Sequence, residues 1–236
     1  MKLLRNSLLA ATLLLCGTIS FAQTVDEIIN KHIDALGGKD KIKGITSLYM
    51  ETSSQIMGND APGTLTILNG KGMKSETEFN GSKMIQCVTD KSGWATNPMS
   101  GNTPEVMPDE QFKASKAQLQ IGGELYDYAA KGTKVELQGK DGNLFKLKVT
   151  AKDSSESTYY IDPSTYLITK MTKSGVVMGQ QVEVVSSFSD YKKTDYGFTI
   201  PYTTQIDLGS MFSLTSTVKK VEINIPVDPK IFEMPK

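Results

Sequence analysis

Apolar residues near the start of the chain recur every three or four positions, the spacing of one face of a helix. Val25, Ile28, Ile29, Ile33 and Leu36 follow this spacing. The pattern predicts an amphipathic helix that packs on the rest of the protein through a single apolar stripe.

Both ends of this helix are also marked in the sequence. Thr24 and Glu27 have the spacing of a capping box, in which the threonine hydroxyl caps the first turn and the glutamate reaches back to it. Gly37-Gly38 follows the last apolar position, where a left-handed residue commonly ends a helix. We therefore expect the helix to begin at Thr24 and to end before Gly37.

From Ile45 onward the period changes to two, which is typical of strands with one buried face. The alternation is clearest from Met73 to Phe79, and Asn80-Gly81 then supplies the two-residue turn of a hairpin. A second alternating segment, Phe145 to Ala151, follows an Asp141-Gly142 turn. Both segments predict antiparallel strands with one apolar and one polar face.

About a dozen strands result when the same criteria are applied along the chain. They are predicted at residues 47–57, 64–69, 73–79, 84–88, 93–96, 133–138, 144–152, 158–161, 167–173, 180–189, 198–207 and 213–223. Short polar connections separate them and no helix recurs between them, so we expect one antiparallel, meandering sheet that curls on itself. The predicted class is α+β, mostly antiparallel β, in a single domain of residues 23–236.

The middle of the chain interrupts this rhythm. Residues 97–108 contain three prolines and are predicted as a loop, and residues 109–121 are predicted as a helix. Gly122-Gly123 ends that helix, and residues 124–130 are predicted to form another short helical turn. The sheet should therefore carry a helical insertion, which brings the expected number of helices to two or three.

Residues 1–22 have the features of a signal peptide. Lys2 and Arg5 precede an apolar stretch, and Ser20-Phe21-Ala22 offers a cleavage site, so we expect the mature chain to begin at Gln23. The stretch is shorter than the ~20 residues that span a bilayer. Leu15 stands where lipoprotein processing before Cys16 would need a small residue, so we expect a soluble periplasmic protein and not a lipid-anchored one.

Composition excludes several classes of function. Hydrophobic residues make up 39% of the chain and charged residues 22%, as in an ordinary globular protein. Without residues 1–22, 24 lysines face 26 acidic residues, a balance that does not point to an electrostatic partner. Arg5 is the only arginine, which argues against nucleic-acid and phosphate ligands.

Groups suited to catalysis are few. His32 is the only histidine, and its place beside the apolar stripe favours a packing role over that of a general base. Cys87 is the only cysteine after residue 22; it shares a strand phase with Ile85 and Thr89 and has no basic neighbour in sequence, which favours a buried small hydrophobe over a reactive thiol. Glu76 and Glu78 resemble a solvated strand face more than an acid/base pair. The sequence thus predicts no enzyme, no metal site and no cofactor.

Ten methionines remain after residue 22, many on the apolar phase of strands. Thioethers suit surfaces that accommodate flexible ligands, although methionine also fills ordinary cores. A curled sheet with an apolar inner face and few helices must either close tightly or leave a hollow. A hollow lined in this way would hold an acyl chain.

Three segments support a family resemblance: Ala35-Leu36-Gly37-Gly38-Lys39-Asp40-Lys41 after the first helix, Tyr196-Gly197-Phe198-Thr199-Ile200-Pro201 in a late strand, and Ile223-Asn224-Ile225-Pro226-Val227-Asp228 with Phe232 near the end. With an export signal, these features resemble the outer-membrane lipoprotein-sorting proteins of the LolA/LolB type, in the variants of Bacteroidetes-like bacteria. The resemblance spans the chain from residue 23. It implies an unclosed half-barrel of about eleven strands, covered by helices, that receives lipid chains on its concave face. The best-known carriers also have an arginine in the cavity region, and this chain has none after Arg5.

On this interpretation the protein is a periplasmic, non-enzymatic carrier, expected as a monomer. Its partners are a lipid or lipoprotein acyl chain and, as further candidates, envelope membrane proteins. The predicted lining consists of Leu48, Met50, Leu65, Ile67, Met73, Phe79, Met84, Phe112, Leu119, Phe145, Leu147, Val149 and Phe198. The alternative is a cell-envelope interaction or sensor module that uses the same fold with a filled core. A third hypothesis, a hydrolase, would have to work without His32.

Overall fold

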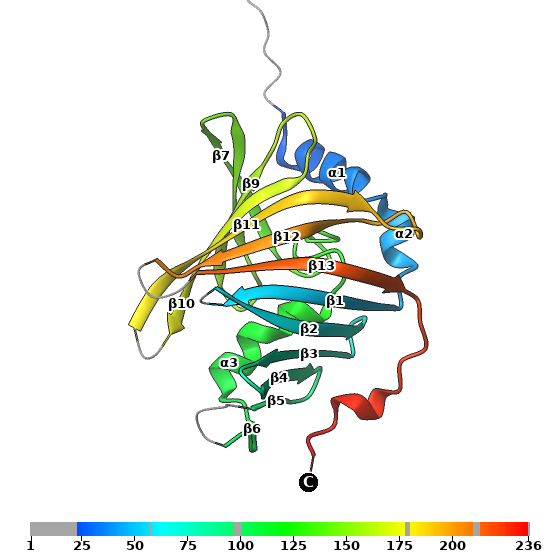
Figure 1. The fold of residues 1–236 in the computed structure, drawn as a ribbon. Coiled ribbons are helices and arrows are strands. Elements are labelled where there is room, and N and C mark those ends of the chain that lie inside the picture. The colour runs from blue at the N-terminus through cyan, green and yellow to red at the C-terminus, as the bar shows by residue number, and fades with distance from the viewer. Residues whose placement is uncertain (1–22, 57, 97–100, 178–179, 210–212, 236) are drawn as a thin grey trace, which may run out of the picture.

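The chain forms one antiparallel sheet that curls but does not close (Figure 1). The computed structural model describes residues 23–235, apart from 57, 97–100, 178–179 and 210–212. Within the described residues thirteen strands pair in the order β6-β5-β4-β3-β2-β1-β13-β12-β11-β10-β9-β8-β7. The predicted fold class is confirmed, with two strands more than the resemblance implied. The predicted signal peptide lies outside the described residues.

The helices are α1 (Val25–Ala35), α2 (Lys39–Lys43) and α3 (Asp109–Ser115), and two 3-10 helices follow as η2 (Lys116–Leu119) and η3 (Pro229–Phe232). The strands are β1 (Ser47–Ile56), β2 (Asn59–Leu68), β3 (Gly72–Phe79), β4 (Ser82–Thr89), β5 (Gly93–Thr96), β6 (Pro104–Val106), β7 (Lys134–Asp141), β8 (Leu144–Thr150), β9 (Glu156–Ile161), β10 (Ile168–Val177), β11 (Gln180–Lys193), β12 (Thr199–Asp207) and β13 (Ser213–Ile223).

The strand order places the middle of the sequence at the two edges of the sheet. β1 pairs with β13, so the first and last strands lie at the centre, whereas β6 and β7 form opposite edges. The connection from β6 to β7 runs through α3, η2 and the turns of residues 120–133. We call residues 107–133 the insertion. It crosses one face of the sheet from edge to edge, and α3 lies behind β1 to β4 in Figure 1.

Local signals positioned the first helix and the central hairpin correctly. Glu27 N donates to the Thr24 hydroxyl at 3.2 Å, and Thr24 N donates to the Glu27 carboxylate at 3.0 Å, so the predicted capping box is present. In the β3–β4 turn, Asn80 and Gly81 have φ of 51° and 74°. Two successive positive φ values are those of a type I′ turn, whose twist matches that of the two strands it joins.

Two of the segments that carry the family resemblance are in direct contact, and the third begins beside the link from α2 to β1. Thr199 N donates to the Leu36 carbonyl at 2.8 Å, which joins the end of α1 to β12. Asn224 accepts from Thr46 N at 2.7 Å and donates to the Gly44 carbonyl at 3.1 Å, which ties the end of β13 to the entry into β1. These segments therefore dock α1 and α2 on the sheet and have a structural role.

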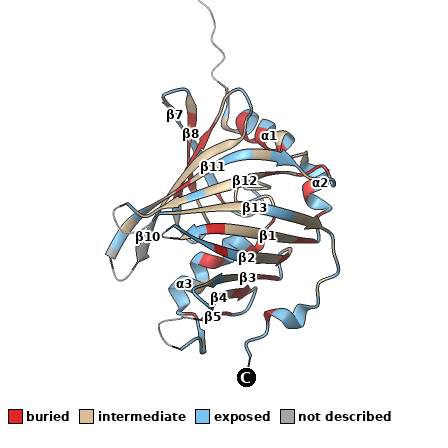
Figure 2. Ribbon diagram, viewed as in Figure 1, coloured by how far each residue is buried: buried red, intermediate tan, exposed pale blue. Residues whose placement is uncertain are grey.

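The main core lies between the helices and the concave face of the sheet (Figure 2). It joins Ile28, Ile29 and Ile33 of α1 to buried residues of β8 and of the insertion. A smaller cluster of Cys87, Trp94 and Phe232 lies on the opposite, convex face, where the C-terminal segment covers β4 and β5. Each face of the sheet thus has its own cover.

The sequence missed three short elements and wrongly predicted one. The helix α2, the edge strand β6 and the 3-10 helix η3 were not predicted, because three to five residues are too short for a periodic pattern to show. Residues 124–130 form hydrogen-bonded turns and not the predicted short helix. Gly122 and Gly123 have φ of +96° and +71°, so the backbone enters this segment from a non-helical conformation.

Candidate functional site

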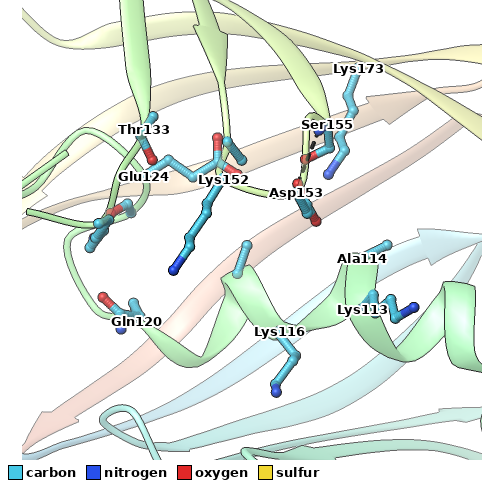
Figure 3. Close-up of a pocket in the computed structure, with 14 residues that line it drawn as sticks. Lys113, Ala114, Lys116, Gln120, Glu124, Thr133, Lys152, Asp153, Ser155 and Lys173 are labelled. Carbon is cyan, nitrogen blue, oxygen red and sulfur yellow. Dashed lines mark hydrogen bonds between the residues drawn. The ribbon is translucent and has the colours of Figure 1, made fainter. Parts of the chain in front are cut away.

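A cavity of about 480 Å³ lies between the insertion and the β8–β10 part of the sheet (Figure 3). Its volume is within the ~300–1,000 Å³ typical of small-molecule sites. The lining residues are Lys113, Ala114, Lys116, Ala117, Gln120, Gly123, Glu124, Lys131, Thr133, Ala151, Lys152, Asp153, Ser155 and Lys173. All of the insertion's contribution comes from residues 113–133, and the remainder comes from the β8–β9 hairpin and β10.

Most of the surface that the cavity walls expose is apolar, although most of the lining side chains end in a polar or charged group. Ala114 and Ala117 line it from the helical side and Ala151 from the β8–β9 hairpin. Long lysine side chains add methylene stems, which can cover apolar ligand surface while the amine stays in water. The cavity therefore offers hydrocarbon in its walls and charge at the ends of flexible side chains.

Five lysines line the cavity, and they differ in direction. Lys152 extends from the β8–β9 hairpin across the space toward Gln120, and Lys173 points from β10 toward Asp153 (Figure 3). Lys116 points away from the cavity in Figure 3, and its Nζ lies 5.0 Å from the centre of the Phe112 ring. The amines of Lys152 and Lys173 are thus directed into or along the space, whereas the Lys116 amine contacts the Phe112 ring outside it.

Lys131 is partly desolvated at the wall of the cavity. Its Nζ donates to the Gly123 carbonyl at 2.8 Å and lies 5.6 Å from the centre of the Tyr126 ring. Burial lowers the pKa of this amine, because the charged form loses hydration. Lys131 therefore holds the turns of the insertion together and adds positive charge to the wall.

Two carboxylates face these lysines, and both accept hydrogen bonds from other groups. Glu124 Oε2 accepts from the Ser157 hydroxyl and from the Tyr159 hydroxyl, each at 3.1 Å. Asp153 accepts from Ser155 N at 3.0 Å, and this bond, aided by the charge of Lys173, lowers the pKa of Asp153.

The Glu124 bonds also tie the insertion to the concave face. Ser157 and Tyr159 belong to β9, and both are buried. Burial raises the pKa of Tyr159, with the Glu124 charge adding to the effect, so the phenol remains a neutral donor. In the other half of the sheet, at the turn between β2 and β3, Gly70 N donates to the Leu119 carbonyl at 2.8 Å. The insertion is therefore bonded to both halves of the sheet.

The residues predicted to line a hollow lie together but are largely packed. Eleven of the thirteen belong to the main core: Leu48, Met50, Leu65, Ile67, Met73, Phe112, Leu119, Phe145, Leu147, Val149 and Phe198. Phe79 and Met84 lie near the β3–β4 turn, half-buried and outside that cluster. None of the thirteen lines the 480 Å³ cavity. The members on neighbouring strands nevertheless share one face, as the pairs Leu48–Ile67, Met50–Leu65 and Ile67–Met73 show.

His32 and Cys87 have the packing roles that the sequence favoured. His32 is 2% exposed, and Nδ1 lies 2.8 Å from the Tyr166 carbonyl, so this nitrogen carries the proton. Cys87 is fully buried, with Sγ 3.2 Å from the Phe232 carbonyl, and burial raises its pKa to about 11. At neutral pH such a thiol is not a nucleophile.

The described part of the chain contains no group of three or more His, Cys, Asp and Glu side chains arranged to hold a metal ion. Among its helices, none has the length and apolarity needed to cross a bilayer. The lysines of the cavity were not singled out from the sequence, because they come from three separate segments that each have an ordinary polar composition. The only available signal was the recurrence of lysine at positions 113 and 116 of the predicted insertion.

No protein-family model and no curated protein matches the chain at the level of sequence. Solved structures do match it. A LolA superfamily protein from Nitrosomonas europaea superposes with a TM-score of 0.58 at 12% identity, covering 90% of this chain and 98% of the other. A DUF1329 family protein from Desulfovibrio piger gives 0.57 at 15% identity, with 89% and 97% covered.

A third solved structure is described as a putative outer membrane lipoprotein-sorting protein domain from Vibrio parahaemolyticus. It matches with a TM-score of 0.54 at 14% identity, covering 87% of this chain and 94% of the other. At these identities the likeness concerns the fold. The chain therefore has the fold of LolA-like lipoprotein-sorting domains, as the sequence resemblance implied.

Proposed function

We propose that this protein is an exported, non-enzymatic binding protein that holds the acyl chain of a lipid or lipoprotein between the insertion and the concave face of the sheet. One observation carries the proposal: the insertion crosses the apolar face of an unclosed sheet and leaves a cavity of about 480 Å³ beside it. An acyl chain in this space would contact alanine methyls and lysine stems. The printed description of the Vibrio parahaemolyticus domain as lipoprotein-sorting supports the same class of ligand.

The energetics of such binding need few polar contacts. Each methylene removed from water contributes ~0.8 kcal/mol, so a chain of a dozen carbons can bind without a dedicated polar pocket. The protein would work in the periplasm after residues 1–22 are removed, as a monomer, and would exchange its ligand with envelope membrane proteins. No step of this function requires a metal, a cofactor or a nucleophile.

Two measurements test the proposal. Mass spectrometry of organic extracts from the purified protein should detect a copurifying lipid, and the delipidated protein should take up a fluorescent fatty acid. Ala117→Trp and Ala151→Trp place an indole in the cavity and should each weaken uptake by at least fivefold. Ala129→Trp is the matched control, because Ala129 is an exposed residue of the same insertion that does not line the cavity.

The outcome that would overturn the proposal is specific. Absence of lipid from the extract, together with no uptake by the wild-type protein, would remove the lipid-binding function. Equal uptake by Ala117→Trp, Ala151→Trp and Ala129→Trp would show that the ligand binds outside this cavity.

A second candidate function is an envelope interaction or sensor module with a filled core. The packing of eleven predicted lining residues into one core favours it, since two of them, Leu147 and Val149, are completely buried. On this alternative, crosslinking in cells should capture a defined protein partner, and the purified protein should carry no lipid.

A further inference from the structure

The lysines around the 480 Å³ cavity give it a charge that differs from that of the whole chain. Five lysines and two carboxylates line it, an excess of three positive charges, whereas residues 23–236 carry 24 lysines and 26 acidic residues. Lys113 and Lys116 come from the insertion, and Lys152 and Lys173 come from the sheet. Positive charge is therefore gathered on both sides of one opening.

The two carboxylates do not neutralise this excess by pairing with the lysines. Within the described part of the chain, no carboxylate oxygen lies within 4.0 Å of the amines of Lys113, Lys116, Lys131, Lys152 or Lys173, although ion pairs form elsewhere. Glu124 is engaged by two hydroxyl groups of β9, and Asp153 by the backbone of its own turn. Lys131 is engaged by the Gly123 carbonyl and Lys116 points toward Phe112, which leaves Lys152 and Lys173 directed at the space.

Lys152 and Lys173 are the amines best placed for this role. Lys152 stands in the space between the hairpin and η2, and Lys173 reaches the same space from β10 (Figure 3). Lysine acts as a mobile point charge without the fixed geometry of arginine, so it can follow carboxylate or phosphate groups of different size. The alanines beneath supply the surface for an attached hydrocarbon chain.

We propose that the ligand is an anionic amphiphile whose negatively charged headgroup is bound by Lys152 and Lys173 while its hydrocarbon chain lies along Ala114, Ala117 and Ala151. This inference rests on the proposed lipid-binding function and adds the chemical class of the headgroup. A fatty-acid carboxylate and a phospholipid phosphate share that chemistry. The preference should weaken as salt rises, because partly exposed charges are screened.

The test compares probes of one chain length with different headgroups. Purified wild-type protein is titrated with a fluorescent fatty acid and with its neutral methyl ester. In a separate competition experiment, the bound fatty acid is displaced with anionic lysophosphatidylglycerol or with zwitterionic lysophosphatidylcholine. We expect the acid to bind roughly five- to tenfold more tightly than the ester, the size expected for two partly exposed charge interactions. If the natural ligand is an anionic phospholipid, lysophosphatidylglycerol should compete better than lysophosphatidylcholine. If it is a free fatty acid, the two lysophospholipids should compete equally poorly.

The variants separate a local effect from one of net charge. Lys152→Gln/Lys173→Gln should abolish the preference for the acid and leave affinity for the ester within twofold. Lys43→Gln/Lys91→Gln removes the same charge at exposed residues outside the cavity and should retain the preference. Circular dichroism checks that both variants fold.

The results also distinguish this inference from the function on which it rests. If wild-type protein binds acid and ester equally, or if Lys152→Gln/Lys173→Gln keeps the preference, the headgroup site is wrong and acyl-chain binding stands. If none of the probes binds, both are wrong.

Discussion

At the scale of single residues, Gly37 fixes how the first helix meets the sheet. Its φ is +122°, and a Cβ at this position would lie 2.5 Å from the carbonyl oxygen of Gly197. The backbone at the end of α1 can therefore approach the β11–β12 turn only because this residue has no side chain. This contact joins two of the segments that carry the family resemblance, through Gly37 of one and Gly197 of the other.

We predict that Gly37→Ala is markedly more destabilising than an alanine at an open glycine. Gly70→Ala is the control, because Gly70 has φ of +71° and nothing within 4 Å of its would-be Cβ. Left-handed backbone alone costs about 1–2 kcal/mol. Gly37→Ala adds a collision with fixed backbone and should cost roughly 2–4 kcal/mol in urea unfolding. Equal losses in the two variants would show that the α1 contact is not tight.

At the scale of elements, the C-terminal segment covers the convex face of β4 and β5. Phe232 is buried, and a Cβ on Gly72 would overlap its ring, so that glycine makes the room that the ring occupies. The Phe232 carbonyl accepts from Trp94 Nε1 at 2.9 Å and from Cys87 Sγ at 3.2 Å. The segment thus attaches by one aromatic ring and two side-chain hydrogen bonds.

This attachment predicts the reactivity of Cys87. In the wild-type protein the thiol should resist Ellman's reagent at pH 8, because it is buried and its pKa is raised to about 11. Phe232→Ala should release the segment and speed labelling by at least tenfold. Met234→Ala, at a residue that is 43% exposed, should leave the rate unchanged. All three proteins begin at Gln23, so Cys87 is their only cysteine. A wild-type rate in Phe232→Ala would show that other contacts hold the segment.

Local pattern predicted the elements well where neighbours in sequence are neighbours in space. The Asn80-Gly81 turn and the Asp141-Gly142 turn each specify a hairpin from local sequence, β3–β4 and β7–β8. The pairing of β1 with β13 is different, because Leu48 and Ile223 are far apart in the sequence and neither strand encodes its partner. The sequence therefore predicted strands and sheet class, whereas the order of the strands needed the structure.

The same distinction explains what could be predicted of the site. Alternation placed Leu48, Ile67 and Val149 correctly on the apolar face, but a filled core and a lined hollow both require such a face. The cavity depends on the path of the insertion, which brings Lys113 opposite Lys152 and Lys173. Each of these lysines taken alone is typical of a solvated surface, so no local pattern could indicate that they converge.

At the scale of the whole molecule, folding stability should depend on pH through the single histidine. His32 joins α1 to the β9–β10 turn, and burial lowers its pKa below 6.5, an effect that its hydrogen bond to the Tyr166 carbonyl only partly opposes. The unfolded chain therefore takes up a proton at a higher pH than the folded chain does. As pH falls below about 6.5, protonation favours the unfolded state, and the free energy of unfolding decreases by up to about 1.4 kcal/mol per pH unit.

Urea unfolding at intervals between pH 7.5 and 5 measures this dependence. His32→Asn retains a donor near the Tyr166 carbonyl and removes the titrating group, so its curve should be flat where the wild-type curve falls. Asp153 and Asp162 have lowered pKa values in the folded protein, and both therefore stabilise it. This stabilisation is fully present above the unfolded pKa of about 3.9 and is lost only as the pH falls below that value. The interval from pH 7.5 to 5 therefore isolates the histidine. A wild-type curve parallel to that of His32→Asn would mean that the imidazole is protonated within the folded protein at no cost to the packing of α1.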